Sequence, residues 1–282
     1  MKIGILGQGY VGSAIKIGFE KHYKDINTFD KYNKSRSTVS NLEELTKSSE
    51  VIFVCLPTPM KENGECDIGI VEKEIVRINK YSTHKKIVVI KSTVPPNTTK
   101  KINNSNKNID VIFNPEFLTE RNFIEDFKKQ NRIVLGGNQK PVDILQQVYT
   151  KVFPNTTIIK TDSTTAEMIK YFTNTFLATK VSFSNEMKII CNEIDVDYDK
   201  VVEYSLYDQR IGKSHLGVPG PDGKLGFGGS CFPKDINALI YFAEQKGIDL
   251  EVLKSVWETN LKVRPERDWE KLQGRAVVKK TR

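Results

Sequence analysis

The stretch Gly7-Gln8-Gly9-Tyr10-Val11-Gly12 decides the fold. It follows an apolar run at residues 2–6 and leads into residues 12–22, whose composition is typical of a helix. In the pattern G-x-G-x-x-G the first glycine allows a tight turn, the second lets a pyrophosphate approach the backbone, and the third lets helix and strand pack closely. The start of the helix then offers N–H donors and a positive dipole end to a phosphate. The stretch therefore predicts a dinucleotide-binding turn, and a glycine turn without a ligand is the alternative.

An acidic residue follows the second predicted strand. Residues 25–29 can form this strand, and Asp30 comes directly after it. A carboxylate at this point accepts hydrogen bonds from both ribose hydroxyls and repels a 2′-phosphate. The predicted cofactor is therefore NAD rather than NADP.

Short runs rich in branched apolar residues continue the alternation of strands and helices. They lie at residues 51–56, 86–90, 111–113, 132–135 and 157–160. Continuous apolar runs are typical of strands that are buried on both faces of a sheet. Strands separated by helical stretches imply right-handed βαβ units. The expected fold is α/β, a Rossmann-type doubly wound parallel sheet, and the NAD-binding domain should cover residues 1–162.

The pattern changes after this point. Ser163–Glu193 contains neither Gly nor Pro, and its apolar residues recur at helical spacing, which predicts one long helix. Further helices are predicted at residues 196–207 and 234–246, with a glycine-rich loop at 212–229 between them. We expect a helical central and dimerisation domain at 163–262, followed by a charged tail at 263–282.

Composition argues against several classes of protein. The formal net charge is +8, but Lys and Arg alternate with acids along the chain, which favours a basic surface or a site for an anionic small molecule over nucleic acid. No apolar run approaches the roughly 20 residues of a membrane span, and glycines interrupt the N-terminus too early for a signal peptide. The four cysteines are scattered, without metal-ligand spacing or a disulfide framework. These features predict a cytoplasmic protein with no metal site and no membrane partner.

A second stretch, Gly226-Phe227-Gly228-Gly229-Ser230-Cys231-Phe232-Pro233-Lys234-Asp235, carries a candidate nucleophile. Its cysteine lies after a glycine loop at a predicted helix start, where a thiolate gains from backbone N–H groups. Lys234 adds positive charge, and Asp235 lies one helical turn beyond the thiol. The alternative for any free cysteine is a buried structural role. That role is favoured for Cys55, within an apolar strand, and for Cys191, on a helix.

From Lys2 to about Asn260 the chain resembles the UDP-glucose/GDP-mannose dehydrogenase family. The shared motifs are, in order, GQGYVG at Gly7, LPTP at Leu56, KSTVPP at Lys91, NPEFLTE at Asn114, RIVLGG at Arg132, the helix with Lys170 and Asn174, DQRIG at Asp208 and GFGGSCFPKD at Gly226. Ser230 and the Phe-Pro-Lys-Asp run after Cys231 resemble members that act on UDP-glucose rather than on N-acetylated sugars. Members usually continue into a further Rossmann-like domain that binds the nucleotide, and here only residues 272–278 resemble its opening strand.

The resemblance implies a role for each matching residue. The residues implied in catalysis are Cys231, Lys170, Asn174, Asp235, Glu120 and Thr93. Those implied in binding NAD are Gly7, Gly9, Tyr10, Val11, Gly12, Asp30, Thr58, Thr93, Glu120 and Lys234. Those implied in binding the nucleotide sugar are Glu116, Phe117, Leu118, Glu120, Lys170, Asn174, Arg210 and Gly228. Arg210 is expected to reach the substrate of the neighbouring subunit in a homodimer.

The resemblance also implies a reaction. The C6 alcohol of UDP-glucose would be oxidised by four electrons to the carboxylate of UDP-glucuronate, through a thiohemiacetal and a thioester on Cys231, with two NAD per sugar. Another nucleotide sugar, GDP-mannose first, is an alternative substrate. A β-hydroxyacid dehydrogenase is a second alternative, but it would not need Cys231. A non-catalytic protein that binds NAD or a nucleotide sugar is the third.

Overall fold

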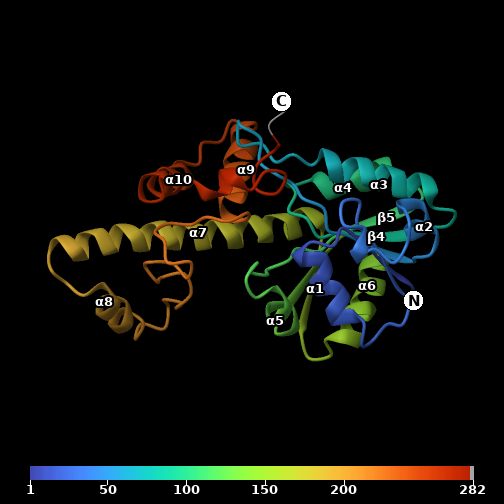
Figure 1. The fold of residues 1–282 in the computed structure, drawn as a ribbon, viewed down its shortest axis with the longest axis horizontal. Coiled ribbons are helices and arrows are strands. Elements are labelled where there is room, and N and C mark those ends of the chain that lie inside the picture. Colours follow the sequence, from blue (N-terminus) through green and yellow to red (C-terminus); the bar gives the residue numbers. More distant parts are fainter. Residues whose placement is uncertain (280–282) are drawn as a thin grey trace. The chain divides into compact units, whose positions relative to one another are not determined.

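The computed structural model describes residues 1–279 and divides into two compact units (Figure 1). The first unit contains residues 1–58 and 68–170, and the second contains residues 59–67 and the chain from Tyr171 onward. This division rests on compactness alone. The domain limits predicted at 1–162, 163–262 and 263–282 therefore stay predictions.

The first unit is built on a seven-stranded sheet in the order β2-β1-β3-β4-β5-β6-β7. The strands are β1 (Ile3–Leu6), β2 (Ile26–Phe29), β3 (Val51–Val54), β4 (Lys86–Ile90), β5 (Ile109–Phe113), β6 (Arg132–Gly136) and β7 (Thr157–Thr161). Strands β1 to β5 are parallel, and the direction of winding reverses between β1 and β3. Such a reversal is the switch point at which doubly wound sheets bind ligands. The predicted fold class is confirmed for these five strands.

The last two strands correct the expectation of a wholly parallel sheet. Strand β6 runs antiparallel to β5, which it meets through the single residue pair Phe113 and Gly136, and β7 is parallel to β6. Between β5 and β6 the only helix is α5 (Phe123–Lys128), whose 6 residues span about 9 Å. This connection therefore lacks a helix that runs back along a strand of about 16 Å, as the helix of a usual βαβ crossover does.

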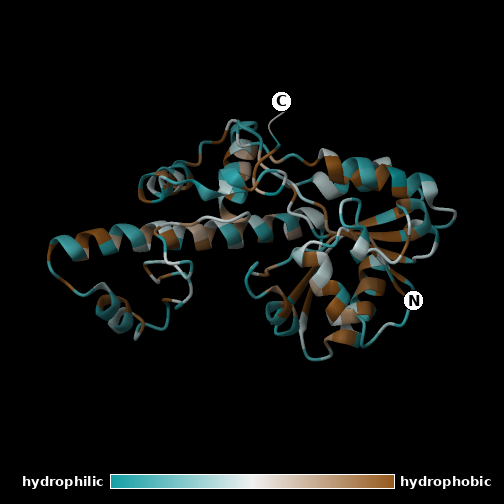
Figure 2. Ribbon diagram, viewed as in Figure 1, coloured by the Kyte–Doolittle hydropathy of each residue, from teal (hydrophilic) through white to brown (hydrophobic). Residues whose placement is uncertain are grey.

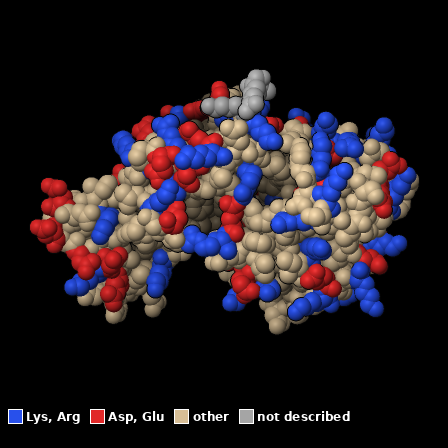
Figure 3. Space-filling model, in the orientation of Figure 1, with Lys and Arg blue, Asp and Glu red and all other residues tan. Residues whose placement is uncertain are grey.

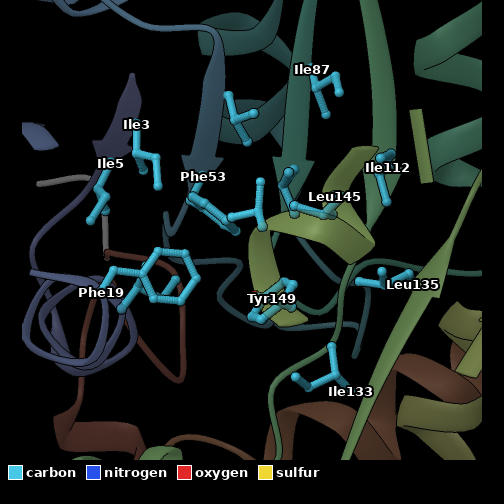
Figure 4. Close-up of a cluster of buried hydrophobic side chains, with 14 of the residues drawn as sticks. Ile3, Ile5, Phe19, Phe53, Ile87, Ile112, Ile133, Leu135, Leu145 and Tyr149 are labelled. Carbon is cyan, nitrogen blue, oxygen red and sulfur yellow. The ribbon is translucent and has the colours of Figure 1, made fainter. Parts of the chain in front are cut away.

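Helices cover both faces of the sheet (Figure 1). One face carries α1 (Tyr10–Phe19) and α6 (Gln139–Val152), and the other carries α2 (Leu42–Lys47), α3 (Gly69–Tyr81) and α4 (Thr98–Ser105). Figure 2 shows the strands between them as hydrophobic. In the core on the α1 face, the ring of Phe19 meets those of Phe53 and Tyr149 edge to face, with centroids 5.6 and 5.5 Å away (Figure 4). Alternate residues of β3 enter the two cores, as a strand buried on both faces requires.

Helix α7 (Ser163–Glu193) has the predicted bounds. Its first residues belong to the first unit, where the Glu167 carboxylate accepts hydrogen bonds from the N–H groups of Asn97 and Thr99 at 2.7 and 2.8 Å. The side chain thus caps the start of α4. Ala166 packs against Gly136 so closely that a Cβ on the glycine would lie 2.4 Å from the alanine methyl.

The second unit contains the rest of α7, with α8 (Tyr198–Ser205), α9 (Phe232–Glu244), α10 (Glu251–Val263) and the 3-10 helix η2 (Asp268–Lys271). The helices predicted at 196–207 and 234–246 are confirmed, with ends displaced by about two residues. The region predicted as a charged tail contributes buried side chains, including Trp269 and Ala276. Its Val277 forms a β-bridge with Met60, which places residues 59–67 in this unit.

Candidate active site

The glycine turn after β1 uses its three glycines in three ways. Gly7 has φ +89°, and a Cβ there would lie 2.5 Å from the carbonyl oxygen of Cys55. A Cβ on Gly12 would lie 2.0 Å from the carbonyl oxygen of Gly7, so helix and turn are in direct contact. Gly9 caps α1 ahead of Tyr10, and a Cβ there would meet nothing within 4 Å. The space over Gly9 and the helix start therefore fit a pyrophosphate.

Asp30 is held rigidly beside this turn. Its Oδ2 accepts a hydrogen bond from the N–H of Gln8 at 2.8 Å, and its Oδ1 accepts from Tyr32 and Asn33 at 2.9 Å each. A carboxylate has about four lone-pair sites, so one site remains to accept from a ribose hydroxyl. Arg36, which sequence analysis did not single out, donates to the carbonyl oxygen of Gln8 at 2.9 Å. Turn and carboxylate together fit NAD.

The loops after β3 and β4 are tied together by one predicted residue. The hydroxyl of Thr58 donates to the carbonyl oxygen of Thr93 at 2.8 Å, and both residues are buried. Both loops leave the carboxyl ends of parallel strands, the edge at which such sheets bind ligands. Thr58 therefore positions the segment that carries Thr93.

A buried ion pair joins the loop after β5 to α7. Lys170 donates from Nζ to the carbonyl oxygen of Glu116 at 2.6 Å and pairs with its Oε1 at 3.0 Å. Glu116 also accepts from the N–H of Leu118 at 2.7 Å. Burial alone would raise the pKa of Glu116, but Lys170 and the Leu118 N–H outweigh it, and the pKa lies below its usual value. The structure thus brings together three residues that were predicted to bind substrate.

A polar network beside this pair was not predicted. Lys91 donates to Oδ1 of Asn114 at 2.8 Å, Tyr149 donates to the same oxygen, and the Asn114 amide donates to the carbonyl oxygen of Val134 at 2.8 Å. Burial lowers the pKa of Lys91 to about 8, against the opposing effects of Cys55 and Glu116. A lysine directly after the apolar run of β4 was the available signal. Nothing in the sequence pointed to the tyrosine.

A cavity of about 300 Å³ opens among these residues in the first unit. Its lining includes the predicted residues Val11, Glu116, Phe117 and Leu118, and also Lys91 and Arg132. The guanidinium of Arg132 lies over the ring of Phe117, 4.2 Å from its centroid. The lining holds three cations, Lys91, Lys129 and Arg132, and two carboxylates, Glu116 and Asp126, and this excess of positive charge suits an anionic ligand. Glu120 lies on the exposed part of the same loop and is not among the lining residues.

In the second unit, the candidate nucleophile lies at the start of α9. Cys231 is the N-cap of this helix and is half-buried, with Sγ 3.9 Å from the hydroxyl of Ser230. Asp235, one turn later, accepts from the amide of Asn174 on α7 at 2.6 Å and pairs with Lys234. Burial alone would lower the pKa of Lys234, but Asp235 and the nearby thiols outweigh it, and the pKa lies above its usual value. The cysteine thus begins a helix whose first turn carries an ion-paired lysine and a carboxylate that is bound by the Asn174 amide.

The remaining cysteines and Arg210 have different surroundings. Burial raises the pKa of the Cys55 thiol to about 12, which makes it inert, and Cys191 is buried beside Tyr198. Arg210 is exposed and forms a forked ion pair with Asp208, with Nε and Nη2 each near a carboxylate oxygen. Its predicted contact with a neighbouring subunit stays a prediction.

Three further features of the described residues are the surface charge, the hydropathy of the helices and the grouping of possible metal ligands. Lys and Arg are interspersed with Asp and Glu over the face shown in Figure 3, without a patch of one sign. Within residues 1–279, no helix combines the length and apolar character that a membrane span needs. In the same residues, no cluster of three or more His, Cys, Asp and Glu side chains could hold a metal ion.

Comparisons with known proteins agree with this geometry. Residues 29–153 match the NAD binding domain of the UDP-glucose/GDP-mannose dehydrogenase family, and residues 164–262 match its central domain. A UDP-glucose 6-dehydrogenase of Rickettsia bellii is 43% identical over 229 residues, which cover 79% of this chain and 51% of the relative. The corresponding protein of Rickettsia prowazekii is 36% identical, with 94% and 68% covered.

The structure of a UDP-glucose dehydrogenase from Pyrobaculum islandicum superposes with a TM-score of 0.83 at 29% identity, covering 93% of this chain and 68% of that one. The chain thus spans about half to two thirds of the length of the relatives it matches. Both domain matches and the identity to full-length relatives lead to one conclusion. The chain belongs to the UDP-glucose/GDP-mannose dehydrogenase family and carries that family's NAD binding domain.

Proposed function

We propose that the protein is an NAD-dependent dehydrogenase that oxidises the C6 alcohol of UDP-glucose to the carboxylate of UDP-glucuronate. The observation that carries the proposal is the half-buried Cys231 at the start of α9, beside Lys234 and the buried Asp235. A dehydrogenase that stops at the carbonyl has no use for a nucleophile, whereas a four-electron oxidation needs one. The relatives named UDP-glucose 6-dehydrogenase support the choice of sugar.

The cofactor would be held by the glycine turn and Asp30, as their geometry indicates. Bound NAD supplies the acceptor for hydride. Lys234 and Glu120 are proposed as further cofactor contacts, on the family resemblance. The enzyme itself must then hold the alcohol, supply the nucleophile and place a water molecule.

Lys170 and Asn174 lie one turn apart on α7 and are proposed to hold the C6 oxygen. In the first step the C6 carbon loses a hydride and its hydroxyl proton passes to water, which leaves an aldehyde. The thiolate of Cys231 then adds to the carbonyl carbon to give a thiohemiacetal. During this addition Lys170 and Asn174 stabilise the oxyanion.

The thiohemiacetal then loses its hydroxyl proton to water and the second hydride to a fresh molecule of NAD, which leaves a thioester on Cys231. Water, positioned by Thr93, Asp235 and Glu120, adds to the thioester carbon. The C–S bond then breaks, the thiolate leaves, and the sugar acid is released. Asp235 suits this task because Asn174 and Lys234 hold its carboxylate in one orientation.

We also propose a homodimer in the reducing cytoplasm. Helix α7 exposes the rings of Phe172, Phe176 and Phe183 by 69%, 55% and 56%, and all four cysteines are free thiols. Large exposed apolar rings on one helix are typical of an interface. A second copy would cover them, with Arg210 reaching the partner's substrate. Sedimentation should show a dimer at micromolar concentration, and a fully active monomer would contradict this.

The test of the reaction is Cys231→Ser. A serine hydroxyl is a far poorer nucleophile near neutral pH, and its ester is less electrophilic than a thioester. Steady-state release of NADH with UDP-glucose should fall by roughly 10³-fold or more, and mass spectrometry should find a covalent sugar adduct on the variant. The same assay with GDP-mannose compares the alternative sugar.

The matched controls are Cys55→Ser and Cys191→Ser. Each places a hydroxyl in a buried site, so each should lower stability and leave turnover per folded molecule little changed. If Cys231→Ser releases two NADH per sugar at the wild-type rate, the proposed reaction is wrong.

A further inference from the structure

The glycine loop before Cys231 is held by side chains from distant parts of the second unit. The N–H of Gly226 donates to Oδ1 of Asn185 on α7 at 3.1 Å. Phe227 pairs with Asn260 on α10 through both of its backbone groups: its N–H donates to Oδ1 at 2.7 Å, and its carbonyl oxygen accepts from Nδ2 at 3.0 Å. Asn260 is 0% exposed. The loop therefore has hydrogen bonds like those that a neighbouring strand would supply.

Arg264, one turn after Asn260, holds three segments with one guanidinium. Its Nε donates to Asp268 at 2.6 Å, its Nη1 donates to the carbonyl oxygen of Leu225 at 3.1 Å, and its Nη2 donates to Asp222 at 2.7 Å. The side chain is 2% exposed. A buried guanidinium is tolerated only where its donors are matched, and here each of the three nitrogens has an acceptor.

The guanidinium also touches the loop directly. A Cβ on Gly228 would lie 2.5 Å from both Nη2 of Arg264 and Oδ1 of Asp268, so only glycine allows this approach. The N–H of Gly229 donates to the other oxygen of Asp268 at 3.3 Å. Every residue from Leu225 to Gly229 is therefore in contact with one of these four side chains, Asn185, Asn260, Arg264 and Asp268, which we name the loop clamp.

We propose that Asn260 and Arg264 are positioning residues, which hold the loop so that Cys231 stays at the start of α9. The inference rests on the proposed role of Cys231 as the nucleophile. Glycine has more backbone freedom than any other residue, so a loop with three glycines has many competing conformations. The loop clamp selects one of them. Through Asp222 the same guanidinium fixes the segment at 213–224, so the two segments move together.

The experiment is Arg264→Lys, which keeps the charge but replaces three donor nitrogens with one. Three quantities are measured on the folded variant: NADH release, the rate at which iodoacetamide alkylates Cys231, located by mass spectrometry, and the Kd for NAD. We expect kcat to fall roughly 100-fold, as for a misplacement of about 1 Å, and alkylation to slow roughly tenfold as the thiolate moves away from the positive end of the α9 dipole. The Kd for NAD should change far less than kcat, because the glycine turn and Asp30 lie in the other unit and only Lys234 among the proposed cofactor contacts lies on α9.

The matched control is Arg267→Lys, three residues along the chain. Arg267 is 49% exposed and pairs with Glu270 at 3.6 Å, so this variant should behave as wild type. If Arg264→Lys does not fold, Asp268→Asn serves instead, because it keeps the side-chain volume and weakens the contacts to Arg264 and Gly229. Wild-type alkylation and turnover in the folded clamp variant would overturn the inference.

The two proposals fail in different ways. Slow alkylation in the clamp variant together with an active Cys231→Ser would support the clamp and refute the proposed reaction. Normal alkylation in the clamp variant together with an inactive Cys231→Ser would refute the clamp and support the proposed reaction.

Discussion

The two glycine loops, at Gly7 and at Gly226, are each held in one conformation, but by different contacts. Each leads into the N-terminus of a helix, α1 in the first unit and α9 in the second. At its glycines the turn at Gly7 is packed against backbone: the closest atoms to a Cβ on Gly7 and Gly12 belong to the main chain of Cys55 and Gly7. Side chains bond this turn at Gln8, through Asp30 and Arg36. The loop at Gly226 is held by side chains from α7, α10 and η2.

The difference follows from what each loop has to do. A turn that offers N–H groups to a phosphate must leave those groups free, so its glycines are held by close backbone packing and side chains bond the backbone of Gln8 instead. A loop that only has to place one side chain can use its N–H and C=O groups for internal hydrogen bonds. Backbone packing tolerates no added atom, whereas a side-chain clamp can be weakened step by step.

The first test of this comparison adds one methyl group to the turn at Gly7. Gly12→Ala would place a Cβ 2.0 Å from a backbone oxygen that cannot move without β1, and the free energy of unfolding should fall by about 3 kcal/mol. Gly9→Ala meets nothing within 4 Å and should change stability by less than about 0.5 kcal/mol. Denaturant unfolding of the two variants compares them, and equal losses would show that packing does not hold the turn.

The second test concerns the ligand that the turn at Gly7 binds. Asp30→Ala removes the acceptor expected for the ribose hydroxyls, so NAD affinity should fall by about 2 kcal/mol and the preference for NAD over NADP should shrink. Titration calorimetry on the folded variant measures both. Asp25→Ala, at the exposed residue just before β2, is the control and should bind NAD as wild type does. Tighter binding of NADP by the wild-type protein would refute the cofactor assignment.

The third test has the smallest expected effect. It concerns the pH dependence of the free energy of unfolding that the loop at Gly226 contributes through Asp268. Burial would raise the pKa of Asp268, but its hydrogen bond to Arg264 outweighs this and the pKa lies below 3.8. Because the folded value is depressed, the stabilisation is present above pH 3.8 and is lost as the pH falls through the folded value.

The expected stabilisation is about 1 kcal/mol, since Asp268 is partly exposed. The difference in unfolding free energy between wild type and Asp268→Asn should therefore be present at pH 7 and should shrink progressively as the pH falls below 3.8. Asp25→Asn, whose carboxyl is exposed, should show no such change. A difference that persists at low pH would show that charge does not contribute to the clamp.

The sequence predicted those parts of the fold that depend on local pattern. The bounds of α7 are correct because 31 residues without Gly or Pro admit one regular structure. The direction of β6 was not predicted, because it depends on the length of α5 and on its packing, and a strand reads the same in both directions. The buried side chains of the region after Val263 were also missed, because Trp269 and Ala276 lie among many charged residues and form no apolar pattern.

The site residues likewise divide into those that a local pattern predicts and those that it does not. The turn at Gly7 was predicted because its function depends on adjacent residues. Asn260 was not, because it lies 33 residues from Phe227, and a buried asparagine near the end of a helix has no local signature. The contact of Tyr149 with Asn114, 35 residues away, is of the same kind. Residues that act through long-range hydrogen bonds become visible only in three dimensions.

The reversed pair of strands has a consequence for how the sheet opens. Strands β6 and β7 pair along five residues, but β6 meets β5 at one residue pair, with the Asn114 amide supplying a further bond to the carbonyl oxygen of Val134. Few ladder bonds must therefore break for β6 and β7 to separate from the parallel strands. Amide hydrogens in β6 should exchange with solvent through this sub-global opening, whereas those in β3 and β4 should exchange only when the whole unit unfolds. One continuous sheet thus contains two cooperative units of exchange.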